Sequence, residues 1–153
     1  MTTSPQFDMR GSCLCGAIAV QITRPPGDML MCHCSQCRKT AGAPFHCVFP
    51  VEADGFKLHD EEHLLREFRS SRDKIRTFCG RCGSPIYSLR DNANSFRVRA
   101  GLFEHLDSVD WGGHIFVRDA VGWYHEHDEL PRYDALEPGR DSAKSKTLLP
   151  DDY

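Results

Sequence analysis

Residues 32–37 read CHCSQC and place three cysteines within six positions of the chain. Two cysteine pairs flank this triplet, one in residues 11–16 (GSCLCG) and one in residues 78–84 (FCGRCGS). Seven of the eight cysteines therefore lie in three short clusters, and Cys47 stands alone. Thiolates at i and i+2, or at i and i+3, converge on one ion when a turn carries them, and soft thiolates favour zinc. The three clusters predict metal binding.

The number of ligands differs between the clusters. The two pairs together supply four thiolates, the closed tetrahedral set of a structural zinc, whereas the triplet supplies three. Three protein ligands with an exchangeable fourth position are typical of a catalytic zinc. One alternative is that the triplet recruits His33, His46, Cys47 or a distant histidine and closes a second structural site. Another is a protein with one zinc and spare buried thiols.

Disulfide bonds are the competing interpretation of an even number of cysteines. The 153-residue chain has no apolar run of about 18 residues and no apolar signal segment at its start. We therefore expect a cytoplasmic protein without a membrane partner, and structural disulfides are rare in that reducing compartment. The net charge of −3 argues against a strongly basic nucleic-acid binder, so we expect no nucleic-acid partner.

Short segments with apolar residues at every second position dominate the chain. Together with similar apolar segments they give six strand candidates, at residues 18–22, 45–49, 75–78, 86–89, 96–98 and 114–117. Proline and glycine turn signals separate them at short intervals, which is typical of a mainly β domain. Within the second candidate, Cys47 alternates with Phe45 and Phe49, so we interpret it as a buried strand residue.

Two segments depart from the strand pattern. Residues 62–69 (EHLLREFR) have apolar residues at helical spacing but are too few to decide between helix and strand. Residues 35–40 predict a single helical turn that follows the cysteine triplet, with Ser35 as its N-cap.

Basic residues gather in the middle of the chain. Residues 66–99 hold nine Lys and Arg against three Asp and Glu. These cations either receive an anionic small molecule or mark a solvated sheet face, and we favour the solvated face because alternate charges on strands usually face water. The residues that would receive the anion are Arg72, Lys74, Arg76, Arg97 and Arg99.

The three clusters, taken in order, resemble the glutathione-dependent formaldehyde-activating enzyme family, also called the CENP-V/GFA domain family. The resemblance continues beyond the cysteines through residues 100–102 (AGL) and 114–117 (HIFV). It ends in residues 123–133, which close on LPRY. About residues 11–135 are covered, between an N-terminal extension of residues 1–10 and a polar C-terminal tail of residues 136–153.

The resemblance implies a mainly β fold, the β-tent or Mss4-like fold, made of small antiparallel sheets with zinc-binding knuckles. It also implies two zinc ions. The first and last cysteine pairs would bind a structural zinc through Cys13, Cys15, Cys79 and Cys82. The triplet would bind the zinc at the reaction centre through Cys32, Cys34 and Cys37.

The activity that the resemblance implies is that of a carbon–sulfur lyase, which interconverts glutathione plus formaldehyde with S-(hydroxymethyl)glutathione. The expected partner is this small thiol adduct or a related one, and a homo-oligomer stays open. Three thiolates on a divalent zinc leave a local charge of about −1, which suits a soft fourth ligand such as a substrate thiol. A proton donor or acceptor is also needed, and we assign this role to none of the candidates His33, His46 and His114.

Two functions of other classes compete with the lyase. One is a non-catalytic zinc-binding module that uses the same fold to bind a protein or a nucleic acid. The other is a thiol redox sensor, in which the open triplet is oxidised and releases its metal.

Overall fold

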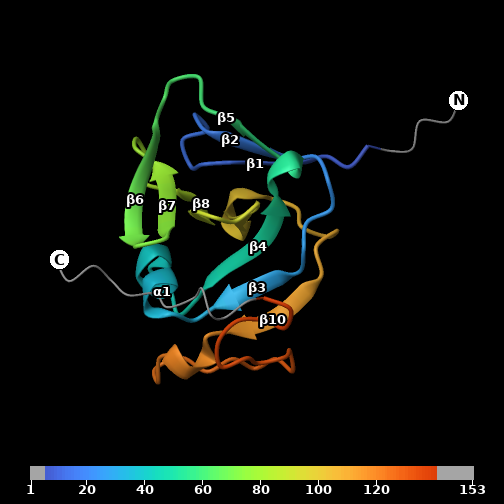
Figure 1. Ribbon diagram of the computed structural model, residues 1–153, viewed down its shortest axis with the longest axis vertical. Helices are drawn as coiled ribbons and strands as arrows, with labels where there is room; N and C mark the ends of the chain where they lie inside the picture. The colour runs from blue at the N-terminus through green and yellow to red at the C-terminus, as the bar shows by residue number, and fades with distance from the viewer. Residues whose placement is uncertain (1–5, 141–153) are drawn as a thin grey trace, which may run out of the picture.

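Two β-sheets make up the protein in the computed structural model, which describes residues 6–140 (Figure 1). The three-stranded sheet has the order β1-β2-β5 and is antiparallel; its strands are Met9–Ser12, Ala19–Ile22 and Phe56–His59. The seven-stranded sheet has the order β10-β3-β4-β9-β8-β7-β6. Its strands are β3 (Met29–Cys32), β4 (His46–Glu52), β6 (Leu65–Ser71), β7 (Lys74–Cys79), β8 (Pro85–Arg90), β9 (Ser95–Arg99) and β10 (Trp111–Ile115).

All strand pairs are antiparallel except β10 with β3, which run parallel. The remaining elements are the helix α1 (Ser35–Ala41) and three 3-10 turns, at Ala53–Gly55, Ala100–Leu102 and Val117–Asp119. The predicted mainly β fold of antiparallel sheets is confirmed. Within residues 6–140, no helix has the length and apolar character needed to cross a bilayer. Residues 1–5 of the expected extension and 141–153 of the expected tail lie outside the described residues.

A helix forms at the triplet and a strand begins within residues 62–69. The expected helix is present as α1, but it includes Cys37 of the triplet and so does not follow it. Its N-cap is Cys34 and not Ser35, since the Cys34 sulfur accepts a hydrogen bond from the backbone N–H of Cys37. The sulfur thus takes the place of the hydroxyl group that usually satisfies this N–H. Residues 65–71 form the strand β6, which settles the ambiguous segment.

The hydrophobic core lies between the two sheets. From the three-stranded sheet and its turn it takes Ile18, Val20 and Ile22, each almost fully buried. Phe49 of β4 and Val98 of β9 meet them from the seven-stranded sheet. Because side chains alternate along a strand, the neighbours of these core residues on β4 and β9 point to the other face of the large sheet. That second face carries the candidate site.

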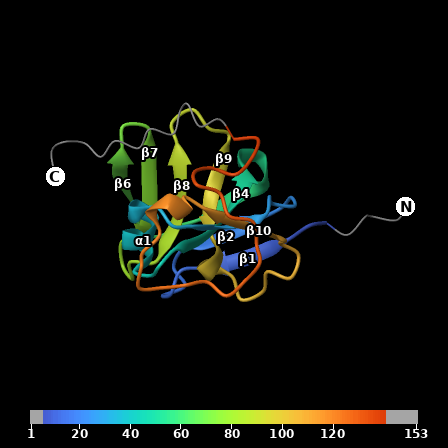
Figure 2. The ribbon, with the colours of Figure 1, turned by 90° about the horizontal axis from the view of Figure 1, so that it is seen from below.

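The chain after β10 turns back along that strand, and we call residues 117–135 the C-terminal strap. The backbone N–H of His114 donates to Pro131, and the N–H of Tyr133 donates to His114, both at 2.8 Å. Seen from below, the C-terminal part of the chain passes in front of the large sheet (Figure 2). Gly113 makes the close approach of the strap to β10 feasible, because its φ is +126° and a Cβ there would lie 2.3 Å from the Pro131 oxygen.

Replacing Gly113 with alanine should displace the strap. A side chain would be strained at this φ and would also collide with the strap backbone, so we expect a stability loss of at least about 2 kcal/mol. Gly101→Ala is the matched control, because nothing lies within 4 Å of its added Cβ. Thermal unfolding measures both variants. An unchanged midpoint for Gly113→Ala would show that the strap does not depend on this contact.

Candidate metal centre

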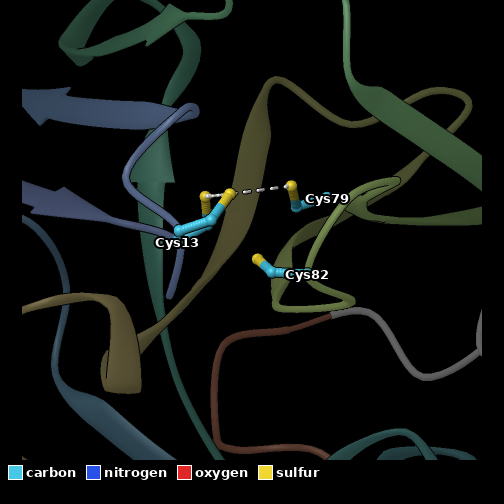
Figure 3. A group of neighbouring side chains, drawn as sticks. Cys13, Cys79 and Cys82 are labelled. Atoms are coloured by element: carbon cyan, nitrogen blue, oxygen red, sulfur yellow. Dashed lines mark hydrogen bonds between the residues drawn. The ribbon is translucent and has the colours of Figure 1, made fainter.

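Four cysteine sulfurs meet where turns of the two sheets approach each other. Cys13 and Cys15 lie in the turn between β1 and β2, whereas Cys79 ends β7 and Cys82 lies in the turn to β8. Cys79 and Cys82 face Cys13 across this junction (Figure 3). All four sulfur atoms lie within 4.8 Å of one another. The sequence-predicted quartet is therefore brought together in space, across 64 residues of chain between Cys15 and Cys79.

Glycine shapes both turns of this quartet. Gly16 follows Cys15 with a φ of +77°, and Gly83 holds the equivalent place in the other turn with a φ of +78°. This left-handed conformation is open to glycine at little cost, and it curls the chain back toward the sulfurs. Backbone N–H groups then reach the cluster, as Ile18 does by donating to the Cys13 sulfur at 3.3 Å.

The spacing of the sulfurs fits a metal ion and not a disulfide. A tetrahedral zinc with bonds of about 2.3 Å to sulfur requires sulfurs about 3.8 Å apart. The distance is 3.6 Å between Cys13 and Cys15 and 3.8 Å between Cys15 and Cys79. All eight cysteines are free. The quartet could hold a metal ion without rearrangement of the turns.

The triplet forms the second sulfur cluster. Cys32 ends β3, Cys34 caps α1, and Cys37 lies in the first turn of α1, so that the three sulfurs lie within 4.8 Å of one another. Hydrogen bonds from the Cys32 and Cys34 sulfurs hold the pKa of Cys37 well below that of an ordinary thiol, and the charge of Arg76 acts in the same direction. The guanidinium of Arg76 lies 3.7 Å from the Cys37 sulfur.

No fourth protein ligand completes the triplet among residues 6–140, because no other Cys, His, Asp or Glu ligand atom lies within 4.8 Å of all three sulfurs. His33 points elsewhere, since it alternates with Cys32 and Cys34 and contacts His114. Cys47 is a half-buried strand residue, and its burial raises the pKa of the thiol. The triplet could therefore hold a metal ion with an open coordination position.

A cavity of about 530 Å³ adjoins the triplet. All three cysteines of the triplet line it, and the opposite wall comes from one face of β7, β8 and β9. Side chains at alternate positions supply the charge of that wall. They are Lys74, Arg76, Arg90, Arg97 and Arg99, and the uncharged Ser88 lies among them.

Three of the four arginines of this wall are buried, so the solvated sheet face that we favoured for Arg76, Arg97 and Arg99 is wrong. The exposed fraction is 5% for Arg76, 7% for Arg97 and 3% for Arg99. Arg72 does lie in solvent, and Lys74 is half-buried. Side chains do alternate between two faces of these strands, but one face packs in the core and the other lines a cavity. Burial lowers the pKa of Arg99 to about 10.

Several polar atoms of the cavity wall lack partners among the described residues. They are Arg97 Nη1, Arg99 Nε and Ser88 Oγ, all buried. By contrast, Arg76 donates to Gln36 and Ser70. Leaving buried donors unsatisfied is costly, and guanidinium groups suit carboxylates. The wall is therefore complementary to an anionic ligand, a property that the charge count of residues 66–99 indicated but did not decide.

Comparison with known proteins agrees with this geometry. A family model described as "Glutathione-dependent formaldehyde-activating enzyme" matches residues 8–119. A Halomonas elongata protein named "Putative glutathione-dependent formaldehyde-activating enzyme" is 34% identical over 86 residues, which are 52% of this chain and 54% of that protein. The chain thus spans about half the length of this curated relative.

A crystal structure of a Rhodobacter sphaeroides protein is similar in fold, with a TM-score of 0.55. Its sequence is 22% identical, and the match covers 67% of this chain and 99% of that protein. At this identity the similarity supports the arrangement of strands and says nothing of the ligand.

Removing one sulfur of the quartet should release metal and destabilise the whole fold. We expect Cys79→Ala to lose one metal equivalent and several kcal/mol of stability, because a metal bound only by the folded state adds its binding energy to folding. Cys47→Ala is the matched control and should retain all metal, at a stability cost of about 1 kcal/mol. Elemental analysis with thermal unfolding measures both. Parental metal content in Cys79→Ala would refute the assignment of the quartet.

Proposed function

Because the chain belongs to the glutathione-dependent formaldehyde-activating enzyme family, we propose that it is a zinc-dependent carbon–sulfur lyase. Its reaction would interconvert glutathione plus formaldehyde with S-(hydroxymethyl)glutathione, or act on a related thiol adduct. Residues 11–135 would form the catalytic domain. The observation that supports this proposal most is the triplet, whose three sulfurs have no fourth protein ligand among the described residues and adjoin a basic cavity.

The donor sets support two zinc sites with different roles. The quartet of Cys13, Cys15, Cys79 and Cys82 is closed and would be structural. The triplet of Cys32, Cys34 and Cys37 would form the reaction centre. A zinc ion there would supply a soft Lewis acid that favours a substrate thiol in its deprotonated form.

The charges of the cavity suit a glutathione thiolate. Arg97 pairs with Glu137 and Arg90 with Asp73, whereas Arg99 has no carboxylate partner among residues 6–140. Glutathione has two carboxylates and one ammonium group, so its thiolate form carries a net charge of −2. We assign Arg99 to bind one substrate carboxylate, because its buried Nε faces no other acceptor. The carboxylate would offset the cost of burying the guanidinium.

The chain's residues would position the reacting groups and exclude water. In the condensation direction, the substrate sulfur attacks the aldehyde carbon and a C–S bond forms. The carbonyl π pair moves to oxygen, which takes up a proton; the reverse reaction breaks the C–S bond and releases the aldehyde. The buried Val48 and Ile115 and the half-buried Phe116 supply an apolar section of the cavity wall near the sulfurs. Binding of the carboxylate by Arg99 would place the substrate sulfur next to the sulfurs of the triplet.

Changing the triplet should abolish activity but keep the fold. The parent should accelerate the exchange between formaldehyde and S-(hydroxymethyl)glutathione above its uncatalysed rate, as measured by exchange NMR at equilibrium. We expect Cys34→Ser to lose this acceleration. The fold should survive because the quartet still joins the two sheets. Cys47→Ala is the control and should exchange at the parental rate. Global unfolding of Cys34→Ser would indicate a structural triplet, and absence of catalysed exchange in the parent would favour a non-catalytic module.

Neutralising Arg99 should weaken substrate binding. We expect Arg99→Met to reduce glutathione affinity by about 10- to 100-fold, the usual loss for a charged hydrogen bond. Arg72→Met is the matched control, because Arg72 is exposed and does not line the cavity.

S-methylglutathione, which has no ionisable thiol, should bind more weakly than glutathione. Calorimetric titration at matched salt decides both points, and equal effects of the two substitutions would remove Arg99 from the substrate site.

A further inference from the structure

A third group of metal-ligating side chains lies apart from both cysteine clusters. His33 follows the end of β3, His114 belongs to β10, and Glu126 belongs to the C-terminal strap. Their ligand atoms lie within 4.8 Å of one another. His33 Nε2 is 2.8 Å from His114 Nδ1 and 3.3 Å from Glu126 Oε1. The exposed fractions are 1% for His33, 0% for His114 and 9% for the Glu126 side chain.

The group lies on the opposite side of the backbone of residues 32–34 from the triplet sulfurs. His33 lies between two triplet cysteines, and successive side chains of an extended chain point to opposite sides. Its ring therefore faces away from the sulfurs and packs against Phe45, with ring centroids 5.2 Å apart. Phe45 also contacts the ring of His114, at 6.2 Å. The site thus has an aromatic wall of its own and shares no ligand with the proposed lyase centre.

Two outer contacts orient the ligands of this group. Both carboxylate oxygens of Asp128 lie 3.1 Å from His114 Nε2, so this nitrogen carries the ring proton and His114 Nδ1 faces inward with a lone pair. Arg132 donates to Glu126 Oε2 at 3.1 Å, which turns Oε1 toward the histidines. A carboxylate on the outer nitrogen of a ligating histidine is the usual arrangement around protein-bound metals.

Electron-pair donors thus converge on one buried point, where a proton or a metal ion is required. His114 Nδ1 and Glu126 Oε1 both accept, and both face His33 Nε2. Either a proton on His33 or a metal ion must lie between them. Zinc bonds of 2.0–2.1 Å to nitrogen and oxygen require ligand atoms about 3.3 Å apart. The His33–Glu126 distance already has this value, and the His33–His114 distance would widen by about 0.5 Å.

We propose that His33, His114 and Glu126 form a third metal site for a divalent first-row transition ion of the zinc type. Two imidazoles and one carboxylate are a donor set that such ions accept, and three protein ligands leave a position for water. The ion would connect the C-terminal strap to the large sheet. The strap supplies Glu126, β10 supplies His114, and His33 directly follows β3. Binding should therefore stabilise the fold by an amount that grows with the logarithm of the free metal concentration once the site is saturated.

The test counts zinc in the full chain with its cysteine sites loaded. We expect the parent to bind one equivalent beyond the cysteine-bound zinc and to melt at a higher temperature as zinc is added. Glu126→Gln should lose this equivalent and the zinc-dependent rise, but retain its cysteine-bound zinc. Glu129→Gln is the matched control: Glu129 belongs to the same strap and is exposed, and this variant should behave as the parent.

A graded variant separates a metal site from a hydrogen-bonded cluster. Asp128→Asn keeps all three ligands but removes the outer carboxylate, and it should weaken the additional zinc by about 10- to 100-fold. Absence of an additional equivalent in the parent would overturn the proposal and leave a proton on His33. An additional equivalent that Glu126→Gln binds as tightly as the parent would also overturn it, by assigning that zinc to another place.

Discussion

The convergence of four sulfurs at the junction of two turns is the constraint on which the rest of the structure depends. One turn belongs to the three-stranded sheet and the other to the seven-stranded sheet, so a metal ion bound by the quartet would join the two sheets directly. The core lies between the same sheets, and one face of the large sheet is thereby committed to packing. Its opposite face is left free for the cavity. A small domain can in this way keep a polar site beside its core without relying on that site for stability.

The cavity face shows how charge is accommodated inside a β-sheet protein. Buried guanidinium groups are costly unless an anion meets them. Carboxylates already meet Arg90 and Arg97, and we assign two further sources of negative charge to the cavity. The Cys37 sulfur forms the first, since its pKa is lowered and Arg76 contacts it. The proposed substrate would supply the second, at Arg99, whose Nε has no partner among residues 6–140. The proposed chemistry and the charges of the cavity wall therefore point to the same ligand: a small anionic thiol.

Much of the site could be predicted from local sequence, because the ligands lie in short clusters whose spacing is chemically informative. The buried arginines could not, since alternation along a strand marks two faces without telling which one meets water. The strand β3 reads MLMC and is buried throughout, so it lacks the alternation that revealed its neighbours. The contact between His33 and His114 joins residues 81 positions apart, and no local pattern links them. Sequence thus reveals the ligands within each cluster better than the pairing between distant segments.

We propose that the quartet is closed and that the triplet is open to a substrate thiol. A crystal structure of the protein soaked with glutathione, recorded at the zinc absorption edge, tests it most directly. We expect one anomalous peak ligated by Cys13, Cys15, Cys79 and Cys82 alone. A second peak should be ligated by Cys32, Cys34 and Cys37, with the glutathione sulfur as the fourth ligand. A protein side chain as the fourth ligand of the second ion, or no ion at the triplet, would contradict the account.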